Sequence, residues 1–273
     1  MTWFETGALG LVQGLTEFLP VSSSGHLALL EWFFGIREPQ TLYDLSLHLG
    51  TLLAVLIYFR GVLRDVAAGV AAWAWARARG AAPEVSQSDA ARLAGVVVIA
   101  TIPTGLIGVA LGDRMEAWSS KPAVTGALLI LNGLILGGTR WLRPSTTTAL
   151  AGFSWARAFL VGVAQGVAIL RGVSRSGSTI VAGTVLGLGP KDAARFSFLL
   201  FVPAVLGGFV LEARHGWPSG AEVTAPQAVV GALVAFGVGL WALKALMSIL
   251  ASSRLHWFGP YCIAVGALAL IAG

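Results

Sequence analysis

Two polar interruptions constrain the fold more than any other feature of this chain. The first runs from Gln13 to His26, QGLTEFLPVSSSGH, and the second from Gln165 to Ser178, QGVAILRGVSRSGS. They align without gaps at a constant offset of 152 residues. A gapless match between two strongly apolar halves indicates an internal repeat. The first copy carries Glu17 and His26 and the second carries Arg175, so we expect the two segments to be halves of one site.

Composition places the chain in a membrane. Of its 273 residues, 56% are hydrophobic and only 11% are charged, against about a quarter charged in an ordinary soluble domain. The net charge of +5 resembles a nucleic-acid signal, but most of it lies in short loops, where it reports membrane topology instead. We therefore expect an integral membrane protein with no nucleic-acid partner.

The first interruption also limits how the chain can cross the bilayer. The apolar stretches 2–15 and 25–35 are each shorter than the roughly 20 residues that a spanning helix needs, and the polar segment 16–24 separates them. Non-helical backbone at membrane depth is tolerated only where protein or a water-filled cavity covers it. A re-entrant helix-loop-helix hairpin fits residues 2–35 better than a spanning helix.

The second half repeats this plan, and the whole chain is predicted to form one all-α membrane domain, 1–273, with six transmembrane helices and two re-entrant hairpins. Residues 61–89 are expected to be a loop with some interfacial helix around Trp73 and Trp75. Repeat one, 1–150, comprises the hairpin 2–35 and spans 41–60, 90–112 and 121–142. Repeat two, 151–273, comprises the hairpin 154–187, broken at Arg171 to Ser178, and spans 191–212, 225–250 and 256–272. An odd number of crossings per repeat inverts the second copy, which is a known membrane architecture.

Basic residues orient this topology, because cytoplasmic loops carry an excess of Lys and Arg. One face holds 12 of the 18: Arg60, Arg64, Arg77, Arg79, Arg92, Arg140, Arg143, Arg157, Lys191, Arg195, Lys244 and Arg254. The other holds four: Arg37, Arg114, Lys121 and Arg214. This asymmetry places both termini and the mouth of the first hairpin outside the cytoplasm, and lets the two hairpin tips meet within the membrane.

Each predicted tip ends in a serine-rich turn at the start of a half-helix. Free N–H groups and the positive dipole end at such a start favour anions. Two of them beside Arg175 suit a phosphate or pyrophosphate, which guanidinium binds bidentately. An ionisable side chain at membrane depth costs ~2.5–3.5 kcal/mol and is functional by default, which applies to Glu17 and Arg175.

Structural alternatives exist for each of these residues. Glu17 and Arg175 would also serve as a buried ion pair, His26 as a helix cap, and the serines as caps or packing contacts. Asp44 and His48 would line the cavity or only its mouth. Close packing is the more frequent role for four glycines: Gly14, Gly25, Gly166 and Gly177. The functional interpretation is favoured because the polar outliers fall at matching positions of the repeat.

At these residues the chain resembles the undecaprenyl-pyrophosphate phosphatase family, the bacitracin-resistance type. The family's first motif, an (E/Q)xxxE followed by a serine-rich turn and Gly-His, is matched by Gln13, Glu17, Ser22, Ser23, Ser24, Gly25 and His26. Its second, PGxSRSxxT, is matched by Gly172, Ser174, Arg175, Ser176 and Thr179. Two points qualify the match: Gln13 is the weaker of the two options at its position, so a second acid for metal binding is missing, and Arg171 stands where the family usually has Pro.

The resemblance implies a multi-pass enzyme of the bacterial inner membrane, with a site open to the periplasm. It would hydrolyse undecaprenyl pyrophosphate to undecaprenyl phosphate and inorganic phosphate, which recycles the lipid carrier for peptidoglycan synthesis. The implied partners are a prenyl pyrophosphate lipid, membrane lipids and, as one option, a second copy in a homodimer. The implied cofactor is a divalent cation, Mg²⁺ or Ca²⁺.

The mechanistic hypothesis assigns catalysis to four residues: Glu17, Ser23, His26 and Arg175. Ser23 attacks the terminal phosphorus or orients a water that does, with Ser22 next to it as an alternative nucleophile. His26 carries the proton, and Glu17 holds the metal or assists the base. Phosphate binding is assigned to Ser22, Ser24, Ser174, Ser176, Thr179, Gly25 and Gly177. A lining or metal-binding role is assigned to Gln13, Glu17, Gln165 and Arg171.

Two rival functions follow from the same pattern. A secondary transporter or lipid-phosphate translocase would also use broken helices at the midplane, although transport needs no proton carrier beside a hydroxyl. A membrane phosphatase of the phosphatidic-acid type needs His seven residues after its Ser. Val181 stands there after Ser174, so that class is excluded.

Overall fold

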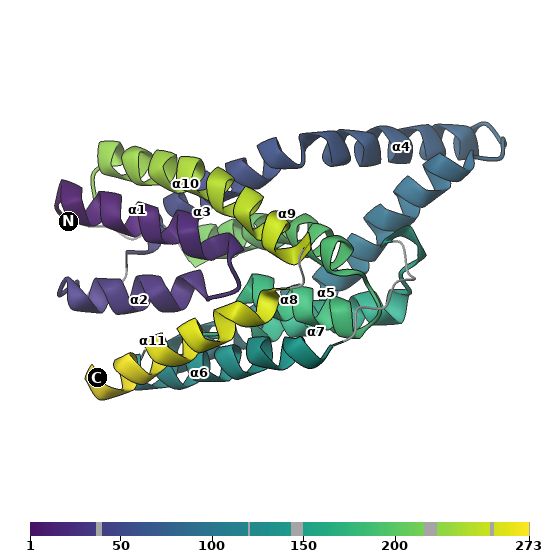
Figure 1. Ribbon diagram of the computed structural model, residues 1–273. Helices are drawn as coiled ribbons and strands as arrows, with labels where there is room; N and C mark the ends of the chain where they lie inside the picture. The colour runs from purple at the N-terminus through teal and green to yellow at the C-terminus, as the bar shows by residue number, and fades with distance from the viewer. Residues whose placement is uncertain (37–39, 120, 143–149, 216–222, 252–253, 273) are drawn as a thin grey trace.

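The computed structural model describes the chain except for residues 37–39, 120, 143–149, 216–222, 252–253 and 273. Throughout the described residues the regular structure is helical (Figure 1). The α-helices are α1 Trp3–Phe18, α2 Ser23–Phe33, α3 Thr41–Tyr58, α4 Arg60–Ala78, α5 Val85–Ser119, α6 Pro122–Gly138, α7 Trp155–Val167, α8 Arg175–Val185, α9 Pro190–His215, α10 Ala225–Ala251 and α11 Phe258–Ala272. Short 3₁₀ helices cover Thr139–Trp141, Leu150–Gly152 and Leu255–Trp257.

The described chain contains five helices long and apolar enough to cross a membrane, and a sixth candidate if α3 and α4 count as one bent span. The five are Val85–Met115, Pro122–Trp141, Pro190–Ala213, Ala225–Leu250 and Leu255–Ala272. The protein is therefore a multi-pass membrane protein. Four of the predicted spans match observed helices to within a few residues: 121–142, 191–212, 225–250 and 256–272.

The region between the first two predicted spans differs from expectation. Residues 61–89 are mostly helical, because α4 runs unbroken for 19 residues and α5 begins at Val85. Ala and Arg, which fill this region, are strong helix formers. The predicted span 90–112 lies inside the 35-residue α5. The predicted span 41–60 corresponds to α3, which is long and apolar enough to cross a membrane only together with α4, and the two helices meet at a bend of 72°. Figure 1 shows α4 and the start of α5 reaching away from the other helices.

Two short hairpins, α1–α2 and α7–α8, have breaks at 19–22 and 168–174. The expected breaks were longer, since α1 extends through Glu17 and α8 already begins at Arg175. In each hairpin a serine caps the N-terminus of the second helix. The Oγ of Ser22 accepts from the Gly25 N–H at 3.3 Å, and that of Ser174 accepts from the Gly177 N–H at 3.0 Å. Such caps satisfy donors that a helix start leaves free, so the capping role of these two serines is confirmed.

Equivalent glycines of the two hairpins pack against other helices. A Cβ on Gly10 or Gly14 of α1 would lie 2.7 or 2.8 Å from a backbone oxygen of α10. On α7, a Cβ on Gly162 would overlap the Ala100 carbonyl of α5, and one on Gly166 would press on Ile107. The close-packing role of Gly14 and Gly166 is confirmed.

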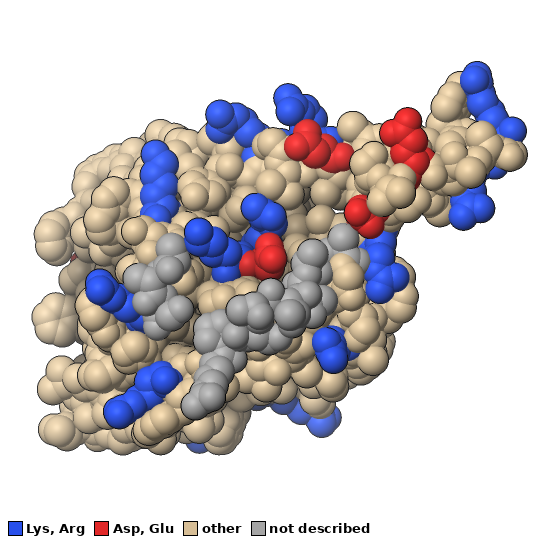
Figure 2. Space-filling view, turned by 45° about the vertical axis from the view of Figure 1, so that its right-hand side comes forward, with Lys and Arg blue, Asp and Glu red and all other residues tan. Residues whose placement is uncertain are grey.

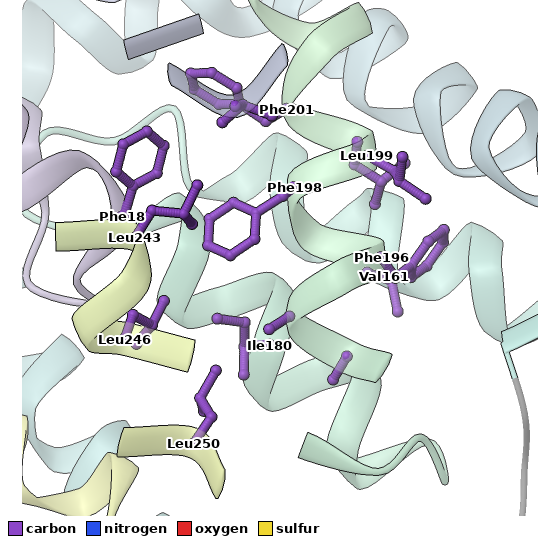
Figure 3. Packing of buried hydrophobic residues seen from close by; sticks show 14 of the residues in the cluster. Phe18, Val161, Ile180, Phe196, Phe198, Leu199, Phe201, Leu243, Leu246 and Leu250 are labelled. Atoms are coloured by element: carbon purple, nitrogen blue, oxygen red, sulfur yellow. The ribbon is translucent and has the colours of Figure 1, made fainter. Parts of the chain in front are cut away.

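The hydrophobic core lies beside the hairpin tips (Figure 3). Phe18, at the end of α1, packs edge-on against Phe198 and Phe201 of α9, with ring centroids 5.7 and 6.2 Å apart. Ile180 of α8 and Leu243 of α10 belong to the same buried cluster. The residue after Glu17 is thus fixed in the core.

Replacing Gly162 by Ala should destabilise the protein, because the new methyl group meets a backbone carbonyl that a side-chain rotation cannot move. Gly137→Ala, on α6, is the matched control: nothing lies within 4 Å of its Cβ, and Ala is better than Gly in a helix interior by up to ~1 kcal/mol. The melting temperature in detergent should fall for Gly162→Ala and stay or rise for Gly137→Ala. Equal melting temperatures for both variants would contradict the close α5–α7 packing.

Candidate active site

The tips of the two hairpins contact each other directly. The Gly172 N–H donates to Ser22 Oγ at 3.1 Å, and Ser176 Oγ donates to the Leu19 carbonyl at 3.3 Å. Gly25 faces Gly172, and Gly177 faces Pro20, each with 3.1–3.2 Å left for a Cβ. Both glycines, which were expected to bind phosphate, therefore lie buried between the tips.

Asn132 of α6 joins the two tips from a third helix. Its side chain is 2% exposed, donates from Nδ2 to the Pro20 carbonyl at 2.9 Å and accepts on Oδ1 from the Ser174 N–H at 3.2 Å. Asn132 was not predicted as part of the site, although a lone amide in an apolar helix is a recognisable signal.

Glu17 is the centre of the contacts between the tips. Its Oε1 forms an ion pair with Arg175 Nη2. Its Oε2 accepts from Ser23 Oγ at 2.5 Å and from Gln13 Nε2 at 3.0 Å, and lies 3.8 Å from His48 Nε2. The structure thus brings together Glu17, Ser23 and Arg175 as expected, and adds His48, which the sequence left at the cavity or its mouth.

Arg175 also packs against the hydrophobic core. Its guanidinium lies 4.5 Å from the ring centroid of Phe201, the same ring that packs against Phe18. An arginine over an aromatic face is stabilised by the ring quadrupole. One aromatic residue of α9 therefore contacts both Arg175 and the residue that follows Glu17 in the chain.

His26 points away from Ser23. Its Nδ1 lies 2.8 Å from the Ser22 carbonyl oxygen and its Nε2 lies 2.9 Å from the Tyr261 hydroxyl of α11. A carbonyl only accepts, so in the neutral ring Nδ1 carries the proton and Nε2 accepts from Tyr261. Ser22 has φ of 70°, an unfavourable conformation for a residue other than Gly. His26 thus holds the carbonyl of a strained residue.

A cavity of about 550 Å³ opens at the tips. Seven of the residues assigned from the sequence line it: Glu17, Ser22, Ser23, Ser24, Gln165, Ser174 and Arg175. The remaining wall comes from α3, α5, α9 and the α7–α8 turn, including His48, Thr104, Asp113, Pro203 and Glu212.

The other assigned residues are placed outside this lining: Gln13, Gly25, His26, Arg171, Ser176, Gly177 and Thr179. Thr179 is fully buried, and its hydroxyl bonds to the Arg175 carbonyl and, at 2.5 Å, to Ser197 Oγ. The Arg171 N–H donates to Ser119 Oγ at 3.0 Å. These contacts stabilise the second hairpin tip, and neither Thr179 nor Arg171 lines the cavity.

The side chains at the hairpin tips do not provide a ligand set for a divalent cation. Within the described chain no group of three or more His, Cys, Asp and Glu could hold a metal. Both oxygens of Glu17 already face donors, and Gln13 uses its amide N–H on that carboxylate. The residues do not fit a metal held by the protein, and Mg²⁺ or Ca²⁺ stays a prediction of the resemblance.

The chain is similar to known proteins along nearly its full length. The family model described as bacitracin resistance protein BacA matches residues 7–268. An undecaprenyl-diphosphatase of Desulfosudis oleivorans is 45% identical over 97% of this chain and 96% of its own. One of Desulfatibacillum aliphaticivorans is 42% identical over 100% and 99%, and one of Salinibacter ruber is 36% identical over 99% of each.

Replacing Asn132 by Leu should loosen both tips at once. The change leaves the Pro20 carbonyl and the Ser174 N–H buried without partners, at ~1–3 kcal/mol each. We expect a lower melting temperature in detergent and reduced turnover. Asn132→Asp should be no milder, because its carboxylate would be buried and would face the Pro20 carbonyl oxygen. Unchanged stability of Asn132→Leu would show that Asn132 does not tie the hairpins together.

Removing His26 should lower turnover through the shape of the tip and not through loss of a proton carrier. His26→Ala frees the Ser22 carbonyl, so the rate falls while the pH dependence of the residual turnover keeps the limbs of the parent protein. Tyr261→Phe removes one of the two ring contacts and should lose less. A limb that disappears only in His26→Ala would restore His26 as an acid or base.

Proposed function

We propose, since the chain belongs to the bacitracin resistance protein BacA family, that it hydrolyses undecaprenyl pyrophosphate to undecaprenyl phosphate and inorganic phosphate. The observation that carries this proposal is the contact of Ser23 with Glu17 and of Glu17 with Arg175, inside one cavity. A hydroxyl, a base and a guanidinium at two helix starts are what attack on a bound phosphate needs.

The nucleophile in this proposal is Ser23. Its hydroxyl donates to Glu17, whereas the Ser22 oxygen already accepts from the Gly25 and Gly172 N–H groups. Ser23 Oγ attacks the terminal phosphorus, its proton passes to Glu17 Oε2, and the bond from phosphorus to the bridging oxygen breaks. The lipid phosphate leaves and takes that proton from Glu17, and water then releases phosphate from the serine.

Charge stabilisation comes from the second hairpin. Arg175 contacts the terminal phosphate, and its guanidinium, already held over Phe201, does not have to reorganise during the reaction. Glu17 acts as the base in place of His26, whose ring is directed to Ser22 and Tyr261. His48, 3.8 Å from Glu17, is a further polar neighbour of that carboxylate.

We infer that both hairpins are re-entrant and that the two repeats are inverted. Reciprocal packing supports this: α1 packs on α10 through Gly10 and Gly14, and α7 packs on α5 through Gly162 and Gly166. The glycines differ by the offset of 152 residues that relates the two polar motifs. The four hairpin arms, α1, α2, α7 and α8, have 11–16 residues each, which is too short to span a bilayer and supports tips that meet within it.

The proposed location is the bacterial inner membrane, with the site open to the periplasm. Figure 2, in which the right-hand end of Figure 1 comes forward, shows Lys and Arg over much of that face, the side assigned to the cytoplasm. Arg37 and Arg143 of the charge count lie outside the described residues. A homodimer stays one option for the assembly, and the mass of the protein in detergent would decide it.

The transporter and translocase alternative gains no support from the relatives, whose names are those of a hydrolase. Phosphate release from undecaprenyl pyrophosphate in detergent, without any gradient across a membrane, distinguishes hydrolysis from transport.

Arg175→Lys should abolish most of that phosphate release while the protein still folds. Lys keeps the charge but loses the bidentate geometry, and loss of a preorganised donor costs ~2.7–4 kcal/mol in the barrier, on the order of 10²–10³ in rate. Ser23→Ala should remove turnover as well, together with any phosphoserine trapped by acid. Arg157→Lys, on the exposed start of α7, is the matched control and should match the parent. Near-normal rates for Arg175→Lys would remove Arg175 from the site.

A further inference from the structure

One buried amide in the cavity wall has a carbonyl oxygen without a donor. Gln165 of α7 is 1% exposed and lines the cavity. Its Nε2 donates to Thr104 Oγ1 of α5 at 3.2 Å, but its Oε1 has no hydrogen-bond partner. Buried polar side-chain atoms are mostly satisfied, so an orphan acceptor in a site needs an explanation.

The contacts of Thr104 fix which end of the amide is free. Its hydroxyl donates to the backbone, to the Gly162 carbonyl at 2.9 Å or the Ala100 carbonyl at 3.2 Å. With its proton used, the Thr104 oxygen can only accept from Gln165. Turning the amide over would place two acceptors together, so Oε1 is the atom left for the cavity.

The matching glutamine of the first repeat also has an unpaired Oε1. Gln13, however, donates to Glu17 and does not line the cavity, so only the Gln165 oxygen belongs to a residue of the cavity wall. Arg175 and the serine hydroxyls of that wall can donate to an anion, whereas Glu17 and Gln165 Oε1 can only accept. An acceptor there cannot bind a fully ionised phosphate oxygen, which also only accepts.

We propose that Gln165 Oε1 accepts a hydrogen bond from an O–H group bound in the cavity and positions it for the reaction; this rests on the proposed phosphatase function. Two sources carry that chemistry: the water that attacks the phosphoserine, and the hydroxyl of a singly protonated terminal phosphate. In the first, the water oxygen bonds to phosphorus and the bond from phosphorus to Ser23 Oγ breaks. One water proton passes through Glu17 to Ser23 Oγ, and the other stays on the phosphate. Gln165 is thus a positioning residue in either case.

The test compares Gln165→Met, which keeps the size and loses the acceptor, with Thr104→Val, which removes the amide's partner and leaves Oε1 in place. Both proteins are assayed in detergent for phosphate release from undecaprenyl pyrophosphate, phosphoserine after acid quench, and melting temperature. We expect Gln165→Met to lose on the order of 10²-fold in rate, as a misplaced reactant does, at an unchanged melting temperature, and Thr104→Val to lose less.

Kinetic measurements distinguish the attacking water from the phosphate hydroxyl as the group that Gln165 binds. A positioned water predicts that Gln165→Met lowers kcat, leaves KM unchanged and accumulates phosphoserine. A bound phosphate hydroxyl predicts a raised KM and no accumulation. A rate within about twofold of the parent, or an equal loss in Thr104→Val with a lowered melting temperature in both, would overturn the proposal and leave Gln165 as a link between α7 and α5. Absence of phosphate release from the parent protein would instead reject the phosphatase function itself.

Discussion

The ion pair between Glu17 and Arg175 joins two hairpins that are 158 residues apart in the chain. A buried ion pair is weak evidence for stability, because desolvation of the charges can exceed their attraction. Here the carboxylate also accepts from Ser23 and Gln13, and the guanidinium lies over Phe201. The pair therefore fixes the relative position of the tips. Loss of either partner would leave a charge in a region of low dielectric, which is the costly outcome.

The remaining contacts between the tips follow from the need to satisfy backbone groups where two helices are broken. Ser22 and Ser174 cap the restarted helices, and Ser22 also accepts from the opposite tip. Asn132 satisfies one carbonyl of the first break and one N–H of the second. Because free backbone groups are expensive away from water, the same contacts that make the breaks tolerable also bring the reacting groups together.

The sequence predicted the tips well because their polar residues stand out in an apolar chain and recur at one offset. Four predicted spans coincide with long apolar helices for the same reason, since long apolar runs have few alternatives. The full length of α4 was not predicted, only some helix around Trp73 and Trp75, because its mixture of Ala, Arg and Trp has no membrane signal. His26 shows the limit of motif reasoning: its partner Tyr261 is 235 residues away, and no local pattern indicates which way the ring turns. Thr179 likewise matched the motif, while Ser197, which binds its hydroxyl, could be found only in three dimensions.

Two kinds of glycine in the structure point to the substrate's lipid part. Gly14 and Gly166 are needed where helices pack in close contact, and a Cβ there would clash. Gly105 and Gly112 of α5, and Gly207 and Gly208 of α9, line the cavity with nothing within 4 Å of a Cβ. Helix packing does not require these four, yet each costs roughly 0.5–1 kcal/mol relative to Ala in a helix. Because they carry no side chain, they leave open space along the α5 and α9 wall of the cavity, which apolar neighbours such as Leu211 also line. The polar groups at the hairpin tips suit a pyrophosphate, and the glycine surface of α5 and α9 leaves room for the hydrocarbon chain attached to it, although Thr104, Asp113 and Glu212 make part of that wall polar.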